Sequence, residues 1–328
     1  MIKDEILDIL WQNPDTYVSG AELGRRLTVS RTAVWKAIEQ LKNEGYRIES
    51  GTNRGYRLSS VSDVLSAKGI ERYLKTPGLS IKVYPTITST NTVLKTMAAE
   101  GAPAGLVLAA GEQTGGRGRL GRSFYSPSGS GIYMSLLLRP HMAAADVTGI
   151  TACAAVAVAQ EIERLSGREA AIKWVNDVFV DGKKVCGILT EASVDCESGM
   201  ILYLVIGIGI NTTLPGKGFP EELRDIAGAA FGSGHPVPDL RCRLAAGVLD
   251  RLTAYCADPA AQTIYEEYKK RSFVLGKPIC ILAAGQPSEP AEALDLERDF
   301  TLVVRCGDGQ IRRLNSGEVS VRIPGPHT

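Results

Sequence analysis

The hydrophobic periodicity of the 328-residue chain changes twice, and these two changes constrain the fold more than any other feature. In the first 60 residues apolar side chains recur at helical spacing, and from residue 79 to residue 272 strand-like runs alternate with helical ones. Beyond residue 273 short strand-like runs alternate with turns. We therefore predict an α+β protein with an N-terminal domain at 1–60, a linker helix at 61–78, a central mixed α/β domain at 79–272 and a small C-terminal β-barrel at 273–328.

The N-terminal 60 residues have the pattern of a winged helix-turn-helix. A first amphipathic helix begins at Ile2, and Ser19 has the position of the N-cap of a short second helix that ends at Leu27. After a tight turn, Ser30 can cap a longer helix that Gly45 ends. A turn rich in Gly and Asn then separates two short strand-like runs, which predicts a hairpin. Three helices followed by such a hairpin define a winged helix-turn-helix.

The charge of this module indicates nucleic acid, although the charge of the whole chain does not. The chain carries a net charge of +1, but from Arg25 to Arg57 eight basic residues stand against three acidic ones. The third helix and the hairpin tip are the parts of such a module that contact DNA phosphates and base edges. A protein-binding module with a solvated basic face is the alternative. We predict DNA binding by Ser30, Arg31, Thr32, Trp35, Lys36 and Arg54.

The rest of the composition excludes several classes of protein. Three scattered histidines have no metal-ligand spacing, so we predict no protein-bound metal and no triad built on histidine. Seven cysteines without a C-x-x-C pair are typical of reduced cytoplasmic thiols. The longest apolar runs, Gly149–Ala159 and Ile201–Ile210, are shorter than the ~18 residues of a membrane span. The acidic N-terminus is not a signal peptide, and we expect a soluble, cytoplasmic protein without membrane contact.

The most unusual segment is GGRGRLGR, at residues 115–122. Three of its glycines satisfy G-x-G-x-x-G, but no helix is signalled after it and His141 stands where a dinucleotide site needs an acid. A Walker lysine is also missing, because Lys184 rather than Ser or Thr follows Lys183. We interpret the segment as a flexible loop whose three guanidinium groups can wrap a carboxylate or a phosphate. An ordinary basic surface turn is the alternative.

A second cluster surrounds a predicted hairpin. The run KWVND at 173–177 precedes a turn at 181–184, and a strand-turn-strand would bring Asn176, Asp177 and one of two adjacent lysines together. A lysine there could neutralise charge that builds up on a reacting phosphoryl or acyl group. Spacing alone favours an exposed hairpin tip.

Two further clusters have both a structural and a ligand-binding interpretation. Residues 88–91, TSTN, precede a helix, where hydroxyl and amide groups act as N-caps and can also hold a polar head group. Residues 207–211, GIGIN, end a buried strand in small residues and an amide. Close approach of a ligand is possible there, but a strand-end bulge is the commoner explanation.

Taken in this order, the motifs STN, GRGRLGR, KWVND, KKVCGIL and GIGIN resemble the biotin protein ligase family. With the N-terminal module, the chain resembles the bifunctional ligase/repressor form, and the resemblance covers nearly the whole length, including an SH3-like barrel at the C-terminus. It implies that biotin and Mg²⁺-ATP give biotinyl-5′-AMP, and that biotin then passes to a lysine of the biotin carboxyl carrier protein of acetyl-CoA carboxylase. ATP, Mg²⁺ and biotin are thus expected as substrates, and no bound redox cofactor is expected.

The resemblance also implies residue roles. Its K-x-x-G-I-L pattern selects Lys184 rather than Lys183, and the catalytic residues would be Lys184, Arg119 and Asp177. Phe124 departs from the family pattern, which usually has a tryptophan packed on the adenine. The biotin-binding residues would be Ser89, Thr90, Asn91, Gln113, Arg117, Gly118, Arg119 and Lys184. The nucleotide-binding residues would be Arg119, Phe124, Asn176, Lys184 and Asn211.

Regulation follows from the resemblance as a hypothesis. The adenylate would act as corepressor, order the loop at residues 115–122 (the arginine loop) and favour a homodimer that binds two operator half-sites. The carrier protein would compete for the same surface of the ligase. A ligand-sensing transcription factor with a non-catalytic ligase fold is the alternative. Lipoate or octanoyl transfer on the same fold, and a ligase whose winged module has lost DNA binding, also remain open.

Overall fold

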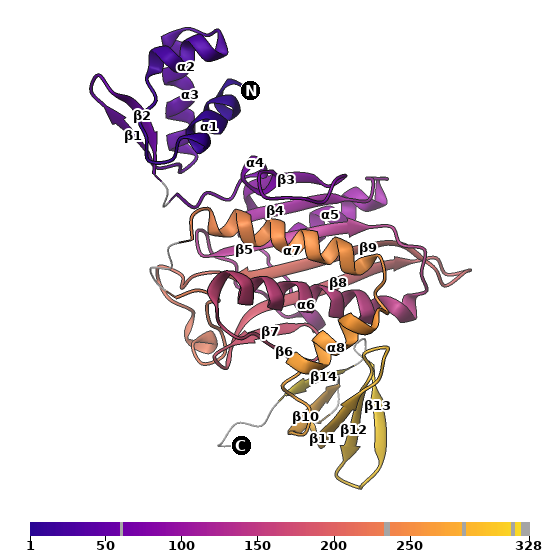
Figure 1. Cartoon of the computed structure of the whole chain (residues 1–328). Helices are drawn as coiled ribbons and strands as arrows, with labels where there is room; N and C mark the ends of the chain where they lie inside the picture. The colour runs from indigo at the N-terminus through magenta and orange to yellow at the C-terminus, as the bar shows by residue number, and fades with distance from the viewer. Residues whose placement is uncertain (60–61, 233–236, 284–286, 316–318, 323–328) are drawn as a thin grey trace. The chain divides into compact units, whose positions relative to one another are not determined.

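A computed structural model of the chain describes residues 1–59, 62–232, 237–283, 287–315 and 319–322 (Figure 1). The chain divides into two compact units. Residues 1–73 and 234–246 make up the first unit, and residues 74–233 and 247–328 make up the second.

The first unit contains the predicted winged helix-turn-helix, which is confirmed. Its helices are α1 (Ile2–Gln12), α2 (Gly20–Leu27) and α3 (Arg31–Asn43), and its antiparallel hairpin is β1 (Ile48–Gly51) and β2 (Gly55–Leu58). Both predicted serine caps form: the Oγ atoms of Ser19 and Ser30 accept hydrogen bonds from the Glu22 and Ala33 amides, at 3.1 and 3.2 Å. Each cap satisfies an amide that the first helical turn leaves without a partner.

The linker helix predicted for residues 61–78 is wrong in length. Helix α4 spans only Ala67–Glu71, and residues 62–66 are not helical. The reason is Ser66, whose backbone is extended (φ −143°, ψ 155°) and whose Oγ accepts from the Gly69 amide at 3.0 Å. Because an N-cap residue is itself outside the helix, the helix can begin only after it. Residue 61 lies outside the described residues.

The second unit is built on a seven-stranded mixed sheet with the order β3-β4-β5-β9-β8-β7-β6. Of its neighbouring strands, β3 and β4 pair in parallel and the other pairs are antiparallel. Its strands are β3 (Ser80–Ile87), β4 (Leu106–Gln113), β5 (Gly131–Leu138), β6 (Ala171–Lys173), β7 (Asp177–Val180), β8 (Lys183–Val194) and β9 (Ile201–Asn211). The sequence pattern does not indicate β3 or β6. It predicts the other five strands to within a few residues, at 106–110, 131–138, 178–180, 187–191 and 201–208.

Helices cover both faces of this sheet. On β8 the Thr190 hydroxyl contacts Thr151 of α6 (Val147–Ser166), whereas the next residue, Glu191, contacts Asn91 and Lys95 of α5 (Thr90–Ala99). Because successive strand residues point to opposite faces, α5 and α6 lie on opposite sides of the sheet. Figure 1 shows α6 and α7 (Leu240–Cys256) running along one of these faces.

Helix α6 is the one described helix that is long and apolar enough for a membrane span, over residues 144–166. Its mean hydropathy is 1.3, but two thirds of it is buried. It packs against β6, β7, β8 and β9, so it is a core helix of this domain.

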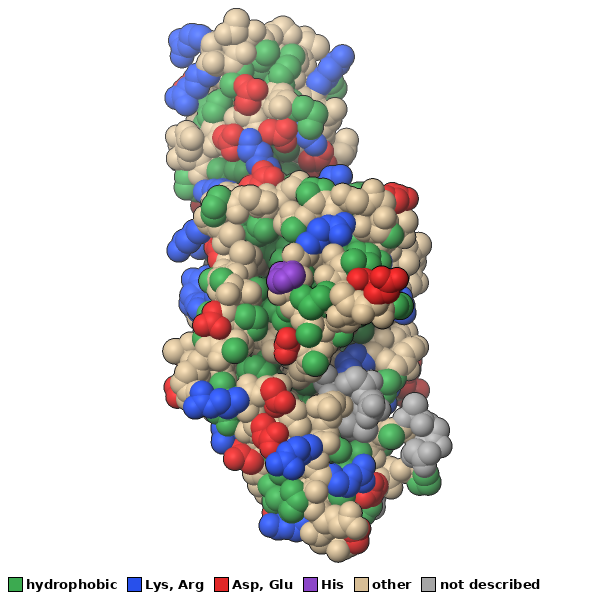
Figure 2. All heavy atoms as spheres, turned by 90° about the vertical axis from the view of Figure 1, so that its right-hand side faces the viewer, with side chains coloured by type: hydrophobic (Ala, Val, Ile, Leu, Met, Phe, Trp, Pro, Cys, Tyr) green, Lys and Arg blue, Asp and Glu red, His purple; other side chains and the backbone are tan. Residues whose placement is uncertain are grey.

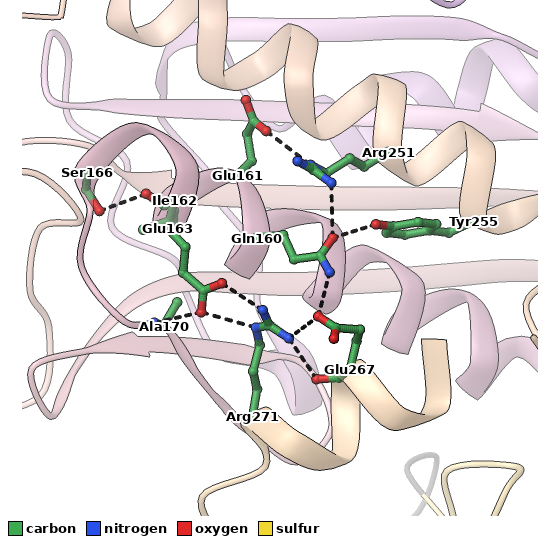
Figure 3. Close-up of polar contacts among 10 residues, drawn as sticks. All are labelled: Gln160, Glu161, Ile162, Glu163, Ser166, Ala170, Arg251, Tyr255, Glu267 and Arg271. Carbon is green, nitrogen blue, oxygen red and sulfur yellow. Dashed lines mark hydrogen bonds and ion pairs between the residues drawn. The ribbon is translucent and has the colours of Figure 1, made fainter. Parts of the chain in front are cut away.

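A partly buried polar network joins α6, α7 and α8 (Gln262–Arg271) (Figure 3). Glu161, only 1% exposed, accepts from Arg251 at 3.1 Å and also pairs with Arg164. The neighbouring Gln160 side chain bridges α7 and α8 through Arg251, Tyr255 and Glu267. Charged side chains are rarely buried unless they are paired in this way, so the network fixes how the three helices pack.

The C-terminal strands form an antiparallel five-stranded sheet in the order β13-β12-β11-β10-β14. They are β10 (Pro278–Ala283), β11 (Glu289–Leu296), β12 (Leu302–Cys306), β13 (Ile311–Leu314) and β14 (Val319–Arg322). The sequence pattern does not predict β11, but it predicts the other four strands, at 278–282, 300–306, 310–314 and 319–323. Residue 323 lies outside the described residues. The all-β character of this segment is confirmed, and its closure into a barrel stays a prediction.

Candidate active site

The four motif clusters of the second unit meet at one pocket, where the start of α5, the arginine loop and strands β7, β8 and β9 come together. Of the predicted ligand-binding and catalytic residues, the pocket is lined by Ser89, Thr90, Asn91, Gln113, Arg117, Gly118, Arg119, Phe124, Asn176, Asp177 and Lys184. Asn211 does not line the pocket. It is 8% exposed, pairs with Gly131 on β5, and its carbonyl accepts from the Ala230 amide at 2.8 Å.

One end of the pocket is a buried cluster of amide and hydroxyl groups around the first turn of α5. The Thr90 amide and hydroxyl both donate to Gln113 Oε1, at 2.9 and 3.1 Å. Ser135 Oγ lies 2.6 Å from Asn91 Oδ1 and 2.7 Å from Thr90 Oγ1. Ser89 Oγ caps the helix by accepting from the Thr92 amide. These contacts fix every polar group of the cluster before a ligand arrives.

The hydrogen-bond directions decide what this end can bind. Both amide hydrogens of Asn91 are used, by the Leu189 carbonyl at 3.1 Å and by Glu191 at 3.0 Å, so Asn91 can offer a ligand only its oxygen. Gln113 is the reverse, because its oxygen accepts from Thr90 while its nitrogen donates to Ser126 at 3.0 Å and keeps one hydrogen. An acceptor and a donor that line the same pocket suit a planar group that carries both N–H and C=O.

Two glycines of β9 make room for this arrangement. A Cβ atom on Gly207 would lie 2.1 Å from Asn91 Oδ1, and one on Gly209 would lie 2.5 Å from the Phe124 ring. The strand-end bulge expected for this segment is wrong: Gly207 and Gly209 pair in register with both β5 and β8. The glycines are therefore needed for close side-chain approach, not for a backbone irregularity.

The predicted hairpin is β7–β8, and it separates the two adjacent lysines. Lys184 Nζ lies 2.6 Å from Asp177 Oδ1 at the pocket, whereas Lys183 Nζ donates to the Asp225 carbonyl at 2.7 Å. The backbone of Lys184 is held on both sides, since its amide donates to the Ile226 carbonyl and its carbonyl accepts from the Gly228 amide, each at 2.8 Å. Lys184 and Asp177 are 28% and 17% exposed, so the pair is not an exposed hairpin tip.

The arginine loop is itself a small hairpin. Its ends are joined by the Phe124 amide, which donates to the Gly116 carbonyl at 2.9 Å, and the Gly118 amide donates to the Arg122 carbonyl at 2.7 Å. Arg119 extends to the turn between β6 and β7, where it donates to Asn176 Oδ1 at 3.1 Å. Burial lowers the pKa of the Arg119 guanidinium, and the nearby Asp177 carboxylate opposes that shift. An arginine still remains charged, because its ordinary pKa exceeds 12.

The pocket therefore has three chemically different parts. The amide cluster lies at one end, and the Phe124 ring packs edge-on against Tyr133, with centroids 6.4 Å apart, over Gly187 and Gly209. The cations Arg119 and Lys184 also line the pocket. Such a pocket can hold two anionic groups of bound ligands next to each other and offset their repulsion.

Sequence reasoning missed several residues of this site, among them Ser135, Tyr133, Ser126 and Glu191. Ser135 and Tyr133 are ordinary strand residues with no local signal. Glu191 had one: it is a carboxylate at the end of an otherwise uncharged run that follows Lys184, and its side chain is only 17% exposed. Among the described residues there is no group of three or more His, Cys, Asp or Glu that could hold a metal ion.

The residues predicted to contact DNA lie on α3, at its N-cap and in the β1–β2 turn. Arg31, Thr32, Trp35 and Lys36 are exposed on α3, and Trp35 is 54% exposed. Arg54 lies in the β1–β2 turn with its guanidinium 4.4 Å from the Tyr17 ring centroid. On the face of the module drawn in Figure 2, basic side chains project from its rim. Ser30 differs from the others because its hydroxyl already caps α3.

Comparison with known proteins agrees with both units. Residues 83–211 match the biotin/lipoate A/B protein ligase family, and residues 3–57 match a helix-turn-helix domain. The chain is 39% identical over 228 residues to the bifunctional ligase/repressor BirA of Bacillus subtilis, which covers 69% of this chain and 70% of that protein. It is 33% identical over 196 residues to BirA of Escherichia coli, 60% of each chain.

Solved structures agree as well. The biotin protein ligase from Aquifex aeolicus in complex with biotin and ATP has a TM-score of 0.62 at 26% identity, over 75% of this chain and 99% of that one. The chain therefore belongs to the biotin/lipoate A/B protein ligase family, and it has the domain organisation of the bifunctional ligase/repressors.

Proposed function

We propose that the protein is an ATP-dependent biotin protein ligase that also represses transcription through its winged helix-turn-helix. The observation that carries the ligase function is that the amide cluster, Arg119 and Lys184 line one pocket, although the start of α5, the end of β4, the arginine loop and β8 supply them. Relatives named as bifunctional ligase/repressors and a neighbour solved with biotin and ATP support both activities.

The amide cluster suits the cyclic urea of biotin. One urea N–H group would donate to the Asn91 oxygen, and the urea carbonyl would accept from the remaining hydrogen of Gln113. Ser89 and Thr90 would complete this end. The other end of biotin, its carboxylate, would then meet the α-phosphate of ATP, with Phe124 against the adenine and Asn176 beside the nucleotide.

The chemistry that follows joins two anions. A carboxylate oxygen of biotin attacks the α-phosphorus, the bond to the β-phosphate oxygen breaks, and pyrophosphate leaves with the Mg²⁺ that entered with ATP. Lys184 and Arg119 would offset the negative charge that builds up between the two groups. Asp177, 2.6 Å from Lys184, would hold that ammonium group in its orientation. The amine of a carrier lysine then attacks the acyl carbon and AMP leaves.

The loop that carries Arg117, Gly118 and Arg119 would close over the adenylate and exclude water, because the mixed anhydride hydrolyses. As part of the same proposal, the closed loop favours a homodimer whose two winged modules bind two operator half-sites, with the adenylate as corepressor. We also propose that Asn211 contributes to the nucleotide site indirectly, and that β10–β14 close into an SH3-like barrel.

The decisive experiment measures adenylate formation by pyrophosphate release with biotin, ATP and Mg²⁺, and then transfer to a carrier domain. We expect Lys184→Ala to lower the rate of adenylate formation about 10²- to 10³-fold, the loss typical of one preorganised charge-stabilising group. Lys183→Ala is the matched control, since its amine contacts backbone carbonyls outside the pocket, and it should stay within a few-fold of the wild type. Equal rates for the two variants would contradict the assignment.

The alternative, a ligand-sensing transcription factor that does not turn over, predicts biotin binding without pyrophosphate release in the wild type. Competition among biotin, lipoate and octanoate for the same site distinguishes biotin transfer from acyl transfer on the related fold. For the repressor function, footprinting on operator DNA with and without biotin plus ATP should show protection that increases when the adenylate forms.

A further inference from the structure

One carboxylate outside the pocket lining contacts both the amide cluster and the arginine loop. Glu191 Oε2 accepts from Asn91 Nδ2 at 3.0 Å, and Glu191 Oε1 accepts from Lys95 Nζ at 2.8 Å. The same Oε1 lies 3.5 Å from Arg117 of the loop. The side chain is 17% exposed, and no part of the proposed reaction uses it.

Its surroundings keep this carboxylate ionised. Burial alone would raise the pKa of Glu191, but hydrogen bonds from Lys95 and Asn91, together with the charges of Lys95 and Arg117, lower it overall. An ionised carboxylate can only accept hydrogen bonds, so it forces the Asn91 amide to present its NH₂ side toward Glu191. The Asn91 oxygen is thereby turned toward Ser135 and the pocket.

We propose that Glu191 is a positioning residue that links the biotin head-group site to the arginine loop. It orients Asn91 for the urea and tethers Arg117, so that one side chain restrains both the biotin head-group site and the arginine loop. The inference rests on the proposed function, because it assigns the amide cluster to biotin. It goes beyond that function by giving Glu191 a role in biotin affinity and in loop closure without contact to either substrate.

Glu191→Gln is the informative substitution because it keeps the shape and removes the charge. A glutamine has one acceptor and one donor, and the donor must face either Asn91 Nδ2 or the Lys95 and Arg117 cations, all of which are donors themselves. One of the two links is therefore lost whichever way the amide points. The Asn91 side chain keeps its bonds to Leu189 and Ser135, so the fold does not depend on Glu191 alone.

The test uses the full chain as wild type, Glu191→Gln and the control Glu197→Gln, which lies in the exposed turn between β8 and β9. Three quantities are measured: biotin affinity by calorimetry without ATP, the KM for ATP, and the rate of tryptic cleavage after Arg119 and Arg122. We expect Glu191→Gln to weaken biotin binding about tenfold, or about 1.4 kcal/mol, and to speed cleavage several-fold. The KM for ATP and all values of the control should stay within about twofold of wild type.

A cycle with Arg117→Ala tests the tether. If Glu191 acts on the loop through Arg117, then Glu191→Gln adds no further cleavage in the Arg117→Ala background, although it still weakens biotin binding. A merely structural residue would instead lower the melting temperature and affect biotin and ATP alike. Should Glu191→Gln not fold, Arg117→Ala alone tests the tether, because cleavage at the wild-type rate would overturn it.

The outcomes also separate this inference from the proposed function. If the wild type binds biotin and releases pyrophosphate while Glu191→Gln matches it in affinity and cleavage, the inference is overturned and the ligase function stands. If the wild type does not bind biotin at all, the proposed function fails, and the inference fails with it.

Discussion

Gly207 and Gly209 provide a way to disable the two halves of the pocket separately. They lie two residues apart on β9, so their missing side chains would point to the same face of the sheet. A methyl group on Gly207 would meet Asn91 Oδ1 at 2.1 Å, and one on Gly209 would meet the Phe124 ring at 2.5–3.1 Å. We predict that Gly207→Ala strongly weakens biotin binding and leaves ATP binding unchanged, whereas Gly209→Ala weakens ATP binding and leaves biotin binding unchanged.

The magnitudes follow from what each methyl group displaces. In Gly207→Ala the Asn91 oxygen must move off its 2.6 Å bond to Ser135, and its neighbours are buried. Breaking a buried hydrogen bond costs about 1–3 kcal/mol, and forcing a methyl group into a packed site costs a similar amount, so biotin affinity should fall at least about 30-fold. In Gly209→Ala a ring edge moves instead of a bonded amide, and only the packing cost of about 1–3 kcal/mol applies.

The assay is calorimetric titration of each variant with biotin and with ATP, accompanied by a melting curve. Gly307→Ala is the matched control: it lies in the turn between β12 and β13, and a Cβ atom there would meet nothing within 4 Å. If Gly207→Ala bound biotin as the wild type does, the assignment of the amide cluster to the head group would be wrong. If both variants lost both ligands equally, the glycines would act on the sheet as a whole and not on two subsites.

Three further predictions concern DNA binding, pH and helix packing. Lys36→Ala should weaken operator and non-specific DNA binding alike and reduce the steepness of the salt dependence by about one unit on the log–log plot, measured by titration at several salt concentrations. The pKa of Glu191 is lowered in the folded protein, so its charge stabilises the fold at pH values above its unfolded pKa. This stabilisation is lost as the pH falls through the folded pKa. The difference in unfolding free energy between wild type and Glu191→Gln should therefore shrink from pH 7 toward pH 3. Arg251→Met leaves the buried Glu161 with Arg164 but without its α7 partner, and should lower the unfolding free energy by about 1–3 kcal/mol in a denaturant titration, while a loss below about 0.3 kcal/mol would contradict the packing role of the network.

Local signals explain which elements the sequence could predict. The winged module was predictable because the N-cap residues Ser19 and Ser30 mark where two helices begin, and the spacing of the apolar residues indicates which helix faces are buried. Strand β3 contains Pro85 and three exposed positions in its first six residues, as an edge strand can, and only its pairing with β4 makes it a strand. Such pairing joins residues distant in sequence, which periodicity does not encode.

The site was predictable as a set of motifs but not as a geometry. Successive strand residues face opposite sides, so only one of Lys183 and Lys184 can reach the pocket, and the register of β7 against β8 decides which one. That register includes an irregularity between Val178 and Phe179, for which the sequence carries no mark. The resemblance to a known family selected Lys184, whereas spacing alone left the choice open.

The near-zero net charge of the chain has a local counterpart at the pocket, where cations are paired with carboxylates. Lys184 is paired with Asp177 and Arg117 faces Glu191, so these cations are held by carboxylates before any substrate arrives. An anionic substrate must then compete with a carboxylate for each cation, which lowers its net binding energy. In return the cation is already aimed and costs less to order. We therefore expect Asp177→Asn to bind the anionic end of the substrate no more weakly than wild type but to form adenylate more slowly. The variant keeps the attraction between Lys184 and the anion but loses the orientation of the Lys184 side chain.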